Sequence, residues 1–168
     1  MIHPLRCAAA GLLVIALALP ALAQAPASPA PSRPPSLAEG DVVSGFEAVG
    51  LDGVSHRVEF PKGSHTVLLF FLSSCPVCHK MLPVWGEYYQ RKAKSLNVVA
   101  VMLDREPPGF FAAIPVPFPV LRSPGASLNQ AFKVHHVPMT IRIGPGGKVE
   151  EAVEGIVDPI KLGEIFRP

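Results

Sequence analysis

A continuously apolar segment that runs directly into a Cys-x-x-Cys sequence is the feature that most limits how this chain can fold. Residues Thr66–Leu72 (TVLLFFL) show no apolar–polar alternation, which is typical of a strand covered on both faces. Cys78, Leu82 and Trp85 then recur at helical spacing, and Cys75 stands just before this stripe. We therefore expect both cysteines at the start of a helix that packs against a sheet.

The remaining pattern predicts an α/β domain with a central mixed sheet flanked by helices. Asn97–Leu103 (NVVAVML) is a second apolar run of strand length. Two further strands, Met139–Ile143 and Val149–Gly155, flank the turn residues Pro145-Gly146-Gly147, which indicates a hairpin. A helix is expected over Pro159–Phe166. This order of elements favours a two-layer packing of helices on a sheet.

The first residues have the three-part order of an export signal. Arg6 precedes the apolar run Ala8–Leu19, which is followed by Ala21-Leu22-Ala23. We predict a secretory signal peptide over residues 1–23 and an exported, periplasmic protein. The alternative is an uncleaved anchor that tethers the protein to the membrane, although the apolar run is shorter than the ~20 residues that span a bilayer.

A Pro-, Ala- and Ser-rich stretch over residues 24–38 offers almost nothing to bury, and we predict an extended linker there. The folded domain is expected over residues 39–168. At its beginning, Phe46–Val49 and His56–Phe60 flank Leu51-Asp52-Gly53, which predicts an extra N-terminal β-hairpin.

Charge and cysteine count narrow the function classes. Arg6 would leave with the signal peptide and residues 1–23 hold no acid, so the net charge of +2 becomes +1. Nucleic acid is therefore not expected as a partner, because such binding needs concentrated positive charge. Cys7 would leave as well, so the three cysteines become one pair in an oxidising compartment.

The position of this pair predicts thiol-disulfide exchange. The partial positive charge at a helix N-terminus stabilises a thiolate, and the thiolate is the species that attacks a disulfide. Cys75 is therefore the candidate nucleophile. Cys78 continues the core-facing stripe and is the candidate that resolves the mixed disulfide. Pro76 suits the first helical turn, and Pro76 and Val77 between the cysteines would tune the reduction potential.

Other interpretations of the pair remain open. A structural disulfide is disfavoured because so short a loop adds little entropic stabilisation. Zinc is disfavoured because no second cysteine pair completes four ligands. A copper-handling module would combine Cys75 and Cys78 with His135 or His136. A redox-inert binding module is the remaining alternative. No cofactor beyond the Cys75–Cys78 disulfide is expected.

The stretch Leu68–Trp85 (LLFFLSSCPVCHKMLPVW) resembles the exported thioredoxin-like TlpA/ResA/CcmG family. Further matches carry the resemblance over residues 39–168: LDG at 51–53, FPVL at 118–121, VPMT at 137–140 and PGGKV at 145–149. Within that family, FFLSSCPVCHKMLP is most similar to the accessory protein of methylamine utilisation (MauD-like), a disulfide-handling factor for methylamine dehydrogenase.

The resemblance implies a thioredoxin fold and a protein thiol-disulfide oxidoreductase. Its substrates would be thiols and disulfides of protein partners, in cytochrome c maturation, in methylamine dehydrogenase maturation or on general clients. A membrane or exported redox partner would restore the pair after each exchange. Val137-Pro138 matches the motif in which a cis-proline faces the cysteines and the preceding residue bonds the partner backbone. The alternative is an ordinary trans proline that opens a strand.

The chain departs from the family pattern around the cysteines. Met81 stands where many members have a Glu that accepts the proton of the second cysteine, and Leu69 stands where thioredoxin has Asp. Ser74 replaces the usual Trp before the first cysteine. Asp104 or His79 is the candidate replacement for the proton acceptor. The alternatives are a solvated acid at a strand end and a surface histidine on a helix.

Overall fold

The computed structural model describes residues 36–168. The signal peptide expected over residues 1–23 and the first part of the expected linker, residues 24–35, lie outside the described residues, so both stay predictions. Between residues 36 and 168, no helix combines the length and the apolar character that crossing a bilayer requires.

The domain is built on a seven-stranded mixed sheet with the strand order β2-β1-β5-β4-β3-β6-β7. Its strands are β1 (Phe46–Gly50), β2 (Ser55–Val58), β3 (His65–Phe71), β4 (Leu96–Met102), β5 (Val120–Arg122), β6 (Met139–Ile143) and β7 (Val149–Glu154). Three α-helices connect strands, α1 (Pro76–Arg91), α2 (Phe110–Ala113) and α3 (Ala126–Ala131), and a fourth, α4 (Pro159–Ile165), follows β7. The predicted α/β architecture around a mixed sheet is confirmed.

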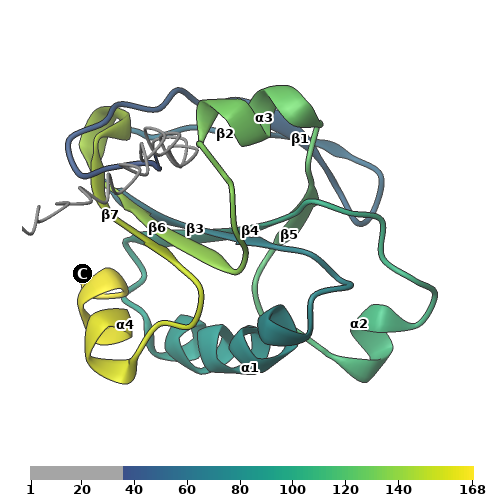
Figure 1. The fold of residues 1–168 in the computed structure, drawn as a ribbon. Helices are drawn as coiled ribbons and strands as arrows, with labels where there is room; N and C mark the ends of the chain where they lie inside the picture. The colour runs from purple at the N-terminus through teal and green to yellow at the C-terminus, as the bar shows by residue number, and fades with distance from the viewer. Residues whose placement is uncertain (1–35) are drawn as a thin grey trace, which may run out of the picture. The chain divides into compact units, whose positions relative to one another are not determined.

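The neighbouring strands β4, β3 and β6 fix the register of the sheet around β3. β3 runs parallel to β4, with Phe71 opposite Met102, and antiparallel to β6, with Phe70 opposite Met139. β1 and β2 pair antiparallel, and only the end of β1 reaches β5. Figure 1 shows α1 and α4 on one face of the sheet and α3 on the other.

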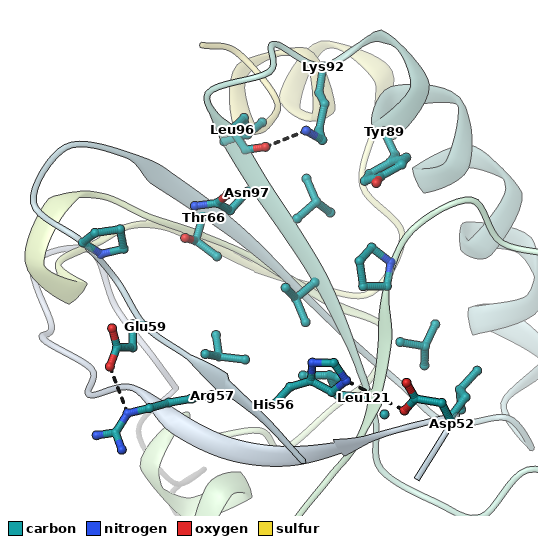
Figure 2. A pocket seen from close by; sticks show the side chains of 18 residues that line it. Asp52, His56, Arg57, Glu59, Thr66, Tyr89, Lys92, Leu96, Asn97 and Leu121 are labelled. Carbon is teal, nitrogen blue, oxygen red and sulfur yellow. Dashed lines mark hydrogen bonds and ion pairs between the residues drawn. The ribbon is translucent and has the colours of Figure 1, made fainter. Parts of the chain in front are cut away.

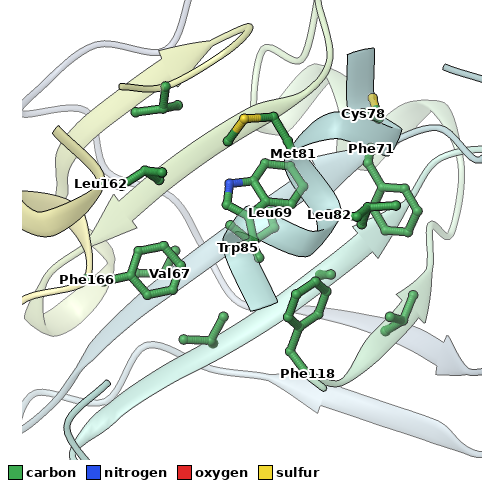
Figure 3. Packing of buried hydrophobic residues seen from close by; sticks show 14 of the residues in the cluster. Val67, Leu69, Phe71, Cys78, Met81, Leu82, Trp85, Phe118, Leu162 and Phe166 are labelled. Atoms are coloured by element: carbon green, nitrogen blue, oxygen red, sulfur yellow. The ribbon is translucent and has the colours of Figure 1, made fainter. Parts of the chain in front are cut away.

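The continuous apolar run of β3 reflects burial on both faces. Val67, Leu69 and Phe71 point toward α1, where Leu82 and Trp85 are fully buried (Figure 3). The intervening side chains of β3 face α3 and the β1–β2 pair. Alternation disappears from the sequence of β3 because neither face of this strand meets water.

A buried arginine interrupts the apolar pattern of β6. Arg142 is only 3% exposed, and its guanidinium donates to Glu150 Oε2 at 2.8 Å. It also donates to the carbonyls of Ile165 and Arg167, at 2.7 Å each. A buried charge needs such partners. Arg142 therefore ties the last turn of α4 to the sheet.

The substitution Leu82→Ala tests the core beneath α1. Because Leu82 is fully buried, its truncation should lower the free energy of unfolding by about 2–5 kcal/mol. Guanidinium unfolding, followed by the fluorescence of the single tryptophan, Trp85, measures the change. The matched control is Ile160→Ala, at a side chain that is 80% exposed, which should change stability by less than about 0.5 kcal/mol. Equal losses in the two variants would contradict this packing.

Candidate functional site

The two cysteines lie at the N-terminus of α1 and differ in exposure. Cys75 is the N-cap residue and is half-buried, whereas Cys78 lies in the first turn and is fully buried. Both are free thiols. The backbone N–H of Cys78 donates to Cys75 Sγ at 3.2 Å. One sulfur thus faces the surface with a backbone donor on it, and the other faces the core.

The local sequence explains this placement. Pro76 is the first helical residue, where a missing N–H breaks no helical bond. Cys75 keeps an extended backbone, with φ −90° and ψ 113°, so that its side chain turns back over the helix end. Pro76 and Val77 are both exposed beside Cys75.

Burial separates the chemistry of the two thiols. Loss of solvation, together with a smaller contribution from its hydrogen bond with Cys75, raises the pKa of Cys78 to about 12. At neutral pH, Cys78 is therefore a neutral thiol. Because Cys75 is only half-buried, its sulfur is the one that a reagent can reach.

Asp104 lies beside the cysteines but bonds to the loop that precedes them. Its carboxylate accepts the backbone N–H and the hydroxyl of Ser73, at 2.7 and 3.0 Å. It also accepts the backbone N–H and the hydroxyl of Ser74, at 3.1 and 3.0 Å. Burial pushes the pKa of Asp104 upward, but these four hydrogen bonds outweigh it and hold the pKa below its ordinary value.

The sequence predicted Asp104 near the site but missed its two serine partners. The available signal was the parallel pairing of two buried strands, since Ser73 and Asp104 each stand two residues beyond the end of their strand. Asp104 was expected as a proton acceptor for Cys78. The structure directs all four of its hydrogen bonds to Ser73 and Ser74, so the proton-acceptor role stays a prediction.

His79 is directed at the same loop. Its Nε2 lies 2.6 Å from the carbonyl oxygen of Ser73, and because a carbonyl can only accept, Nε2 carries the proton and donates. The imidazole ring also packs on Phe110 of α2, with ring centroids 5.6 Å apart. His79 therefore links the start of α1 to the loop and to α2.

Val137 and Pro138 come from a distant part of the sequence and face the cysteines. The carbonyl oxygen of Val137 lies 4.0 Å from Cys75 Sγ, and the Val137–Pro138 peptide bond is cis. Val137 is half-buried, while Pro138 is buried just before β6. The structure thus brings together the cysteine pair and the proposed substrate-binding residues.

The histidines considered for a copper site are exposed. His135 and His136 lie in the loop before Val137. Within residues 36–168, no three His, Cys, Asp or Glu side chains come together as a metal-ligand set. The structure therefore does not bring either histidine into such a set with Cys75 and Cys78.

A cavity of about 840 Å³ lies elsewhere in the domain. Figure 2 shows it between β2 and the first half of β4, with His56, Thr66 and Asn97 on its walls. Thr66 lies at the start of β3, whereas Cys75 follows the end of that strand, and neither cysteine lines the cavity. The cysteine pair is thus not part of this cavity.

Comparison with known proteins identifies the family. The Redoxin family model matches residues 28–153. The chain belongs to the Redoxin family. Among its relatives, the thiol-disulfide oxidoreductase ResA from Bacillus subtilis is 27% identical over 124 residues, which are 71% of this chain and 69% of that protein.

Solved structures agree with this assignment. A Chlorobium tepidum protein assigned as thiol:disulfide interchange protein DsbE matches with 30% identity and a TM-score of 0.64, over 77% of this chain and 94% of that one. StoA from Bacillus subtilis shares the fold, with 24% identity and a TM-score of 0.63 over 74% of this chain and 97% of its own. The predicted thioredoxin fold and TlpA/ResA/CcmG membership are confirmed. This Redoxin member belongs to a group of protein thiol-disulfide oxidoreductases.

Alkylation of the reduced protein tests the difference between the two thiols. At pH 8, a thiol with a pKa of about 12 is ionised in roughly one molecule in ten thousand. Iodoacetamide should therefore label Cys75 and leave Cys78 unlabelled, as read by mass spectrometry of the digested protein. In guanidinium, which exposes Cys78, both should be labelled. Equal labelling of the folded protein would show that Cys78 is not protected.

Proposed function

We propose that this chain is an exported thiol-disulfide oxidoreductase that exchanges disulfides with protein partners through Cys75 and Cys78. The observation that carries the proposal is the asymmetry of the pair. Cys75 Sγ is reachable and accepts a backbone N–H at the helix end, while Cys78 is buried directly beneath it. This arrangement suits a nucleophile followed by a resolving thiol.

The exchange proceeds in two steps. The Cys75 thiolate attacks one sulfur of a partner disulfide, the partner S–S bond breaks, and the released partner thiolate takes up a proton. Cys78 then loses its proton and attacks Cys75 Sγ, which forms the Cys75–Cys78 disulfide and releases the second partner sulfur as a thiol. Two electrons pass to the partner, and the reverse sequence oxidises a dithiol.

Val137 and Pro138 provide the proposed contact for the partner backbone. The carbonyl of Val137 lies next to Cys75 Sγ, and Val137 keeps part of its surface exposed. An extended partner segment could pair with the backbone here and present its cysteine to Cys75. Pro138, buried behind Val137, would keep this backbone in place.

We also propose where the protein acts and how its cysteine pair is restored after each exchange. The expected signal peptide would direct the protein to the periplasm, and a membrane or exported redox partner would restore the cysteine pair. Candidate clients are apocytochrome c, a methylamine dehydrogenase subunit and a wider range of disulfide-containing proteins. No copper-binding role is proposed.

Trapping with cysteine variants tests the roles of the pair. Cys78→Ser should accumulate a mixed disulfide between Cys75 and its client, because the resolving thiol is missing. Non-reducing electrophoresis and mass spectrometry of the trapped species would identify that client. Cys75→Ser is the matched control and should trap nothing. If Cys75→Ser supported the biological role as well as the natural chain does, a redox-inert binding module would replace the proposal.

The reduction potential of the pair decides the direction of exchange. It is measured by equilibration with glutathione or dithiothreitol. A value near the roughly −270 mV of thioredoxin would indicate a reductase, and one toward about −120 mV would indicate a disulfide donor. A pair that does not equilibrate with either reagent would contradict thiol-disulfide exchange.

A further inference from the structure

The two serines before Cys75 give all four of their polar hydrogens to one carboxylate. Ser73 and Ser74 each donate a backbone N–H and a hydroxyl to Asp104, over distances of 2.7 to 3.1 Å. Among side chains, only an ionised carboxylate offers two accepting oxygens and no hydrogen that would oppose the donors. The loop is therefore matched to an ionised acid at this position.

The anchor of this loop belongs to the rigid part of the domain. β3 and β4 pair in parallel up to Phe71 and Met102, and the N–H of Leu103 continues the ladder to the carbonyl of Phe71 at 2.9 Å. Asp104 follows immediately, so its carboxylate is held by the sheet. On the other side, His79 of α1 donates to the Ser73 carbonyl at 2.6 Å. The loop is thus fixed to the sheet and to the helix.

The position of Cys75 depends on this loop. The N–H of Cys75 bonds to the Leu72 carbonyl at 3.2 Å, which closes a turn around Ser73 and Ser74. Its extended backbone then lets Sγ accept the N–H of Cys78 at 3.2 Å. If the turn shifted, the sulfur would lose its alignment with the helix end.

We infer that Asp104 is a positioning residue. It holds Ser73 and Ser74 so that the Cys75 sulfur keeps its hydrogen bond from the N–H of Cys78. The inference rests on the proposed exchange function and deepens it, because it names the residue that maintains the nucleophile. Asp104 acts through the loop and does not touch the partner.

The negative charge of Asp104 and its positioning role should have opposite effects on the reactivity of the cysteine site. A nearby carboxylate disfavours a second negative charge, and Asp104 is among the groups that raise the pKa of Cys78. Removing the charge alone removes a repulsion and should therefore not slow the alkylation of Cys75. Loss of alignment should make Cys75 react more slowly. The sign of the change separates the two effects.

The test is Asp104→Asn in the reduced full chain. The amide keeps the shape of the side chain but replaces one accepting oxygen with a donor that faces the serine donors. Alkylation of Cys75 by iodoacetamide at pH 7 should slow by about tenfold, the size expected for losing one charge-assisted hydrogen bond to the thiolate. An unchanged or faster rate would overturn the inference.

A pair of variants at Ser74 keeps the inference testable if Asp104→Asn fails to fold. Ser74→Ala removes one of the four hydrogen bonds, whereas Ser74→Thr keeps the hydroxyl. Ser74→Ala should give a smaller slowing than Asp104→Asn, and Ser74→Thr should restore the natural rate. Equal rates for the two serine variants would count against the inference, whatever the behaviour of Asp104→Asn.

Asp41→Asn controls for general loss of stability. Asp41 accepts from the N–H of Ala38 and from Lys133 Nζ, and it bonds through its backbone to Val149. Val149 pairs with Ile143, which lies opposite the start of β3, so Asp41 is at the far end of the sheet from Cys75. The variant should melt at a lower temperature but alkylate at the natural rate. Slowing in this control to the same extent would overturn the inference.

The outcomes also distinguish this inference from the proposed function. If the natural chain exchanges with glutathione while Asp104→Asn alkylates normally, the positioning role fails and the function stands. If the natural chain does not exchange but Asp104→Asn still slows alkylation, the positioning role stands and the function fails.

Discussion

The position of the site depends on β3, a strand that is buried on both faces and paired on both sides. β4 lies along one edge of β3 and β6 along the other. The residues that follow β3 therefore meet Asp104, two residues beyond the end of β4, and Pro138, the residue before β6. Cys75 lies where these three strand ends converge. Because both edges of β3 are occupied, a shift in its register would also displace the elements around the cysteines.

The helix that follows β3 sets the difference between the two thiols. The N-cap of α1 lies at the helix end, where backbone donors meet solvent. Three residues later, the helix presents the stripe that faces the sheet. Cys75 occupies the first position and Cys78 the second. Desolvation then keeps Cys78 protonated, while Cys75 receives the Cys78 N–H on its sulfur. Helix geometry and packing against the sheet together thus give two identical side chains different chemistry.

Several residues of the site could be predicted because they belong to local patterns. The apolar run of β3, the spacing of the cysteines and Pro76 at the helix start define Cys75 and Cys78 without knowledge of the rest of the fold. Asp104 was expected nearby because it ends the adjacent strand, but its bonds to Ser73 and Ser74 were not expected. Those bonds depend on how closely the ends of β3 and β4 lie together. This spacing cannot be read from the sequence of either strand.

By itself, the sequence determined which segments form strands and helices and which cysteine faces the core, because these follow from the period of apolar residues. The tertiary structure alone decided what each polar side chain bonds. Arg142 reads as an interruption of an apolar strand, yet it is buried because the carbonyls of Ile165 and Arg167 come within its reach. Asp104 holds a loop for the same reason. Hydrogen bonds act over about 3 Å, so their partners are fixed only when distant segments are packed together.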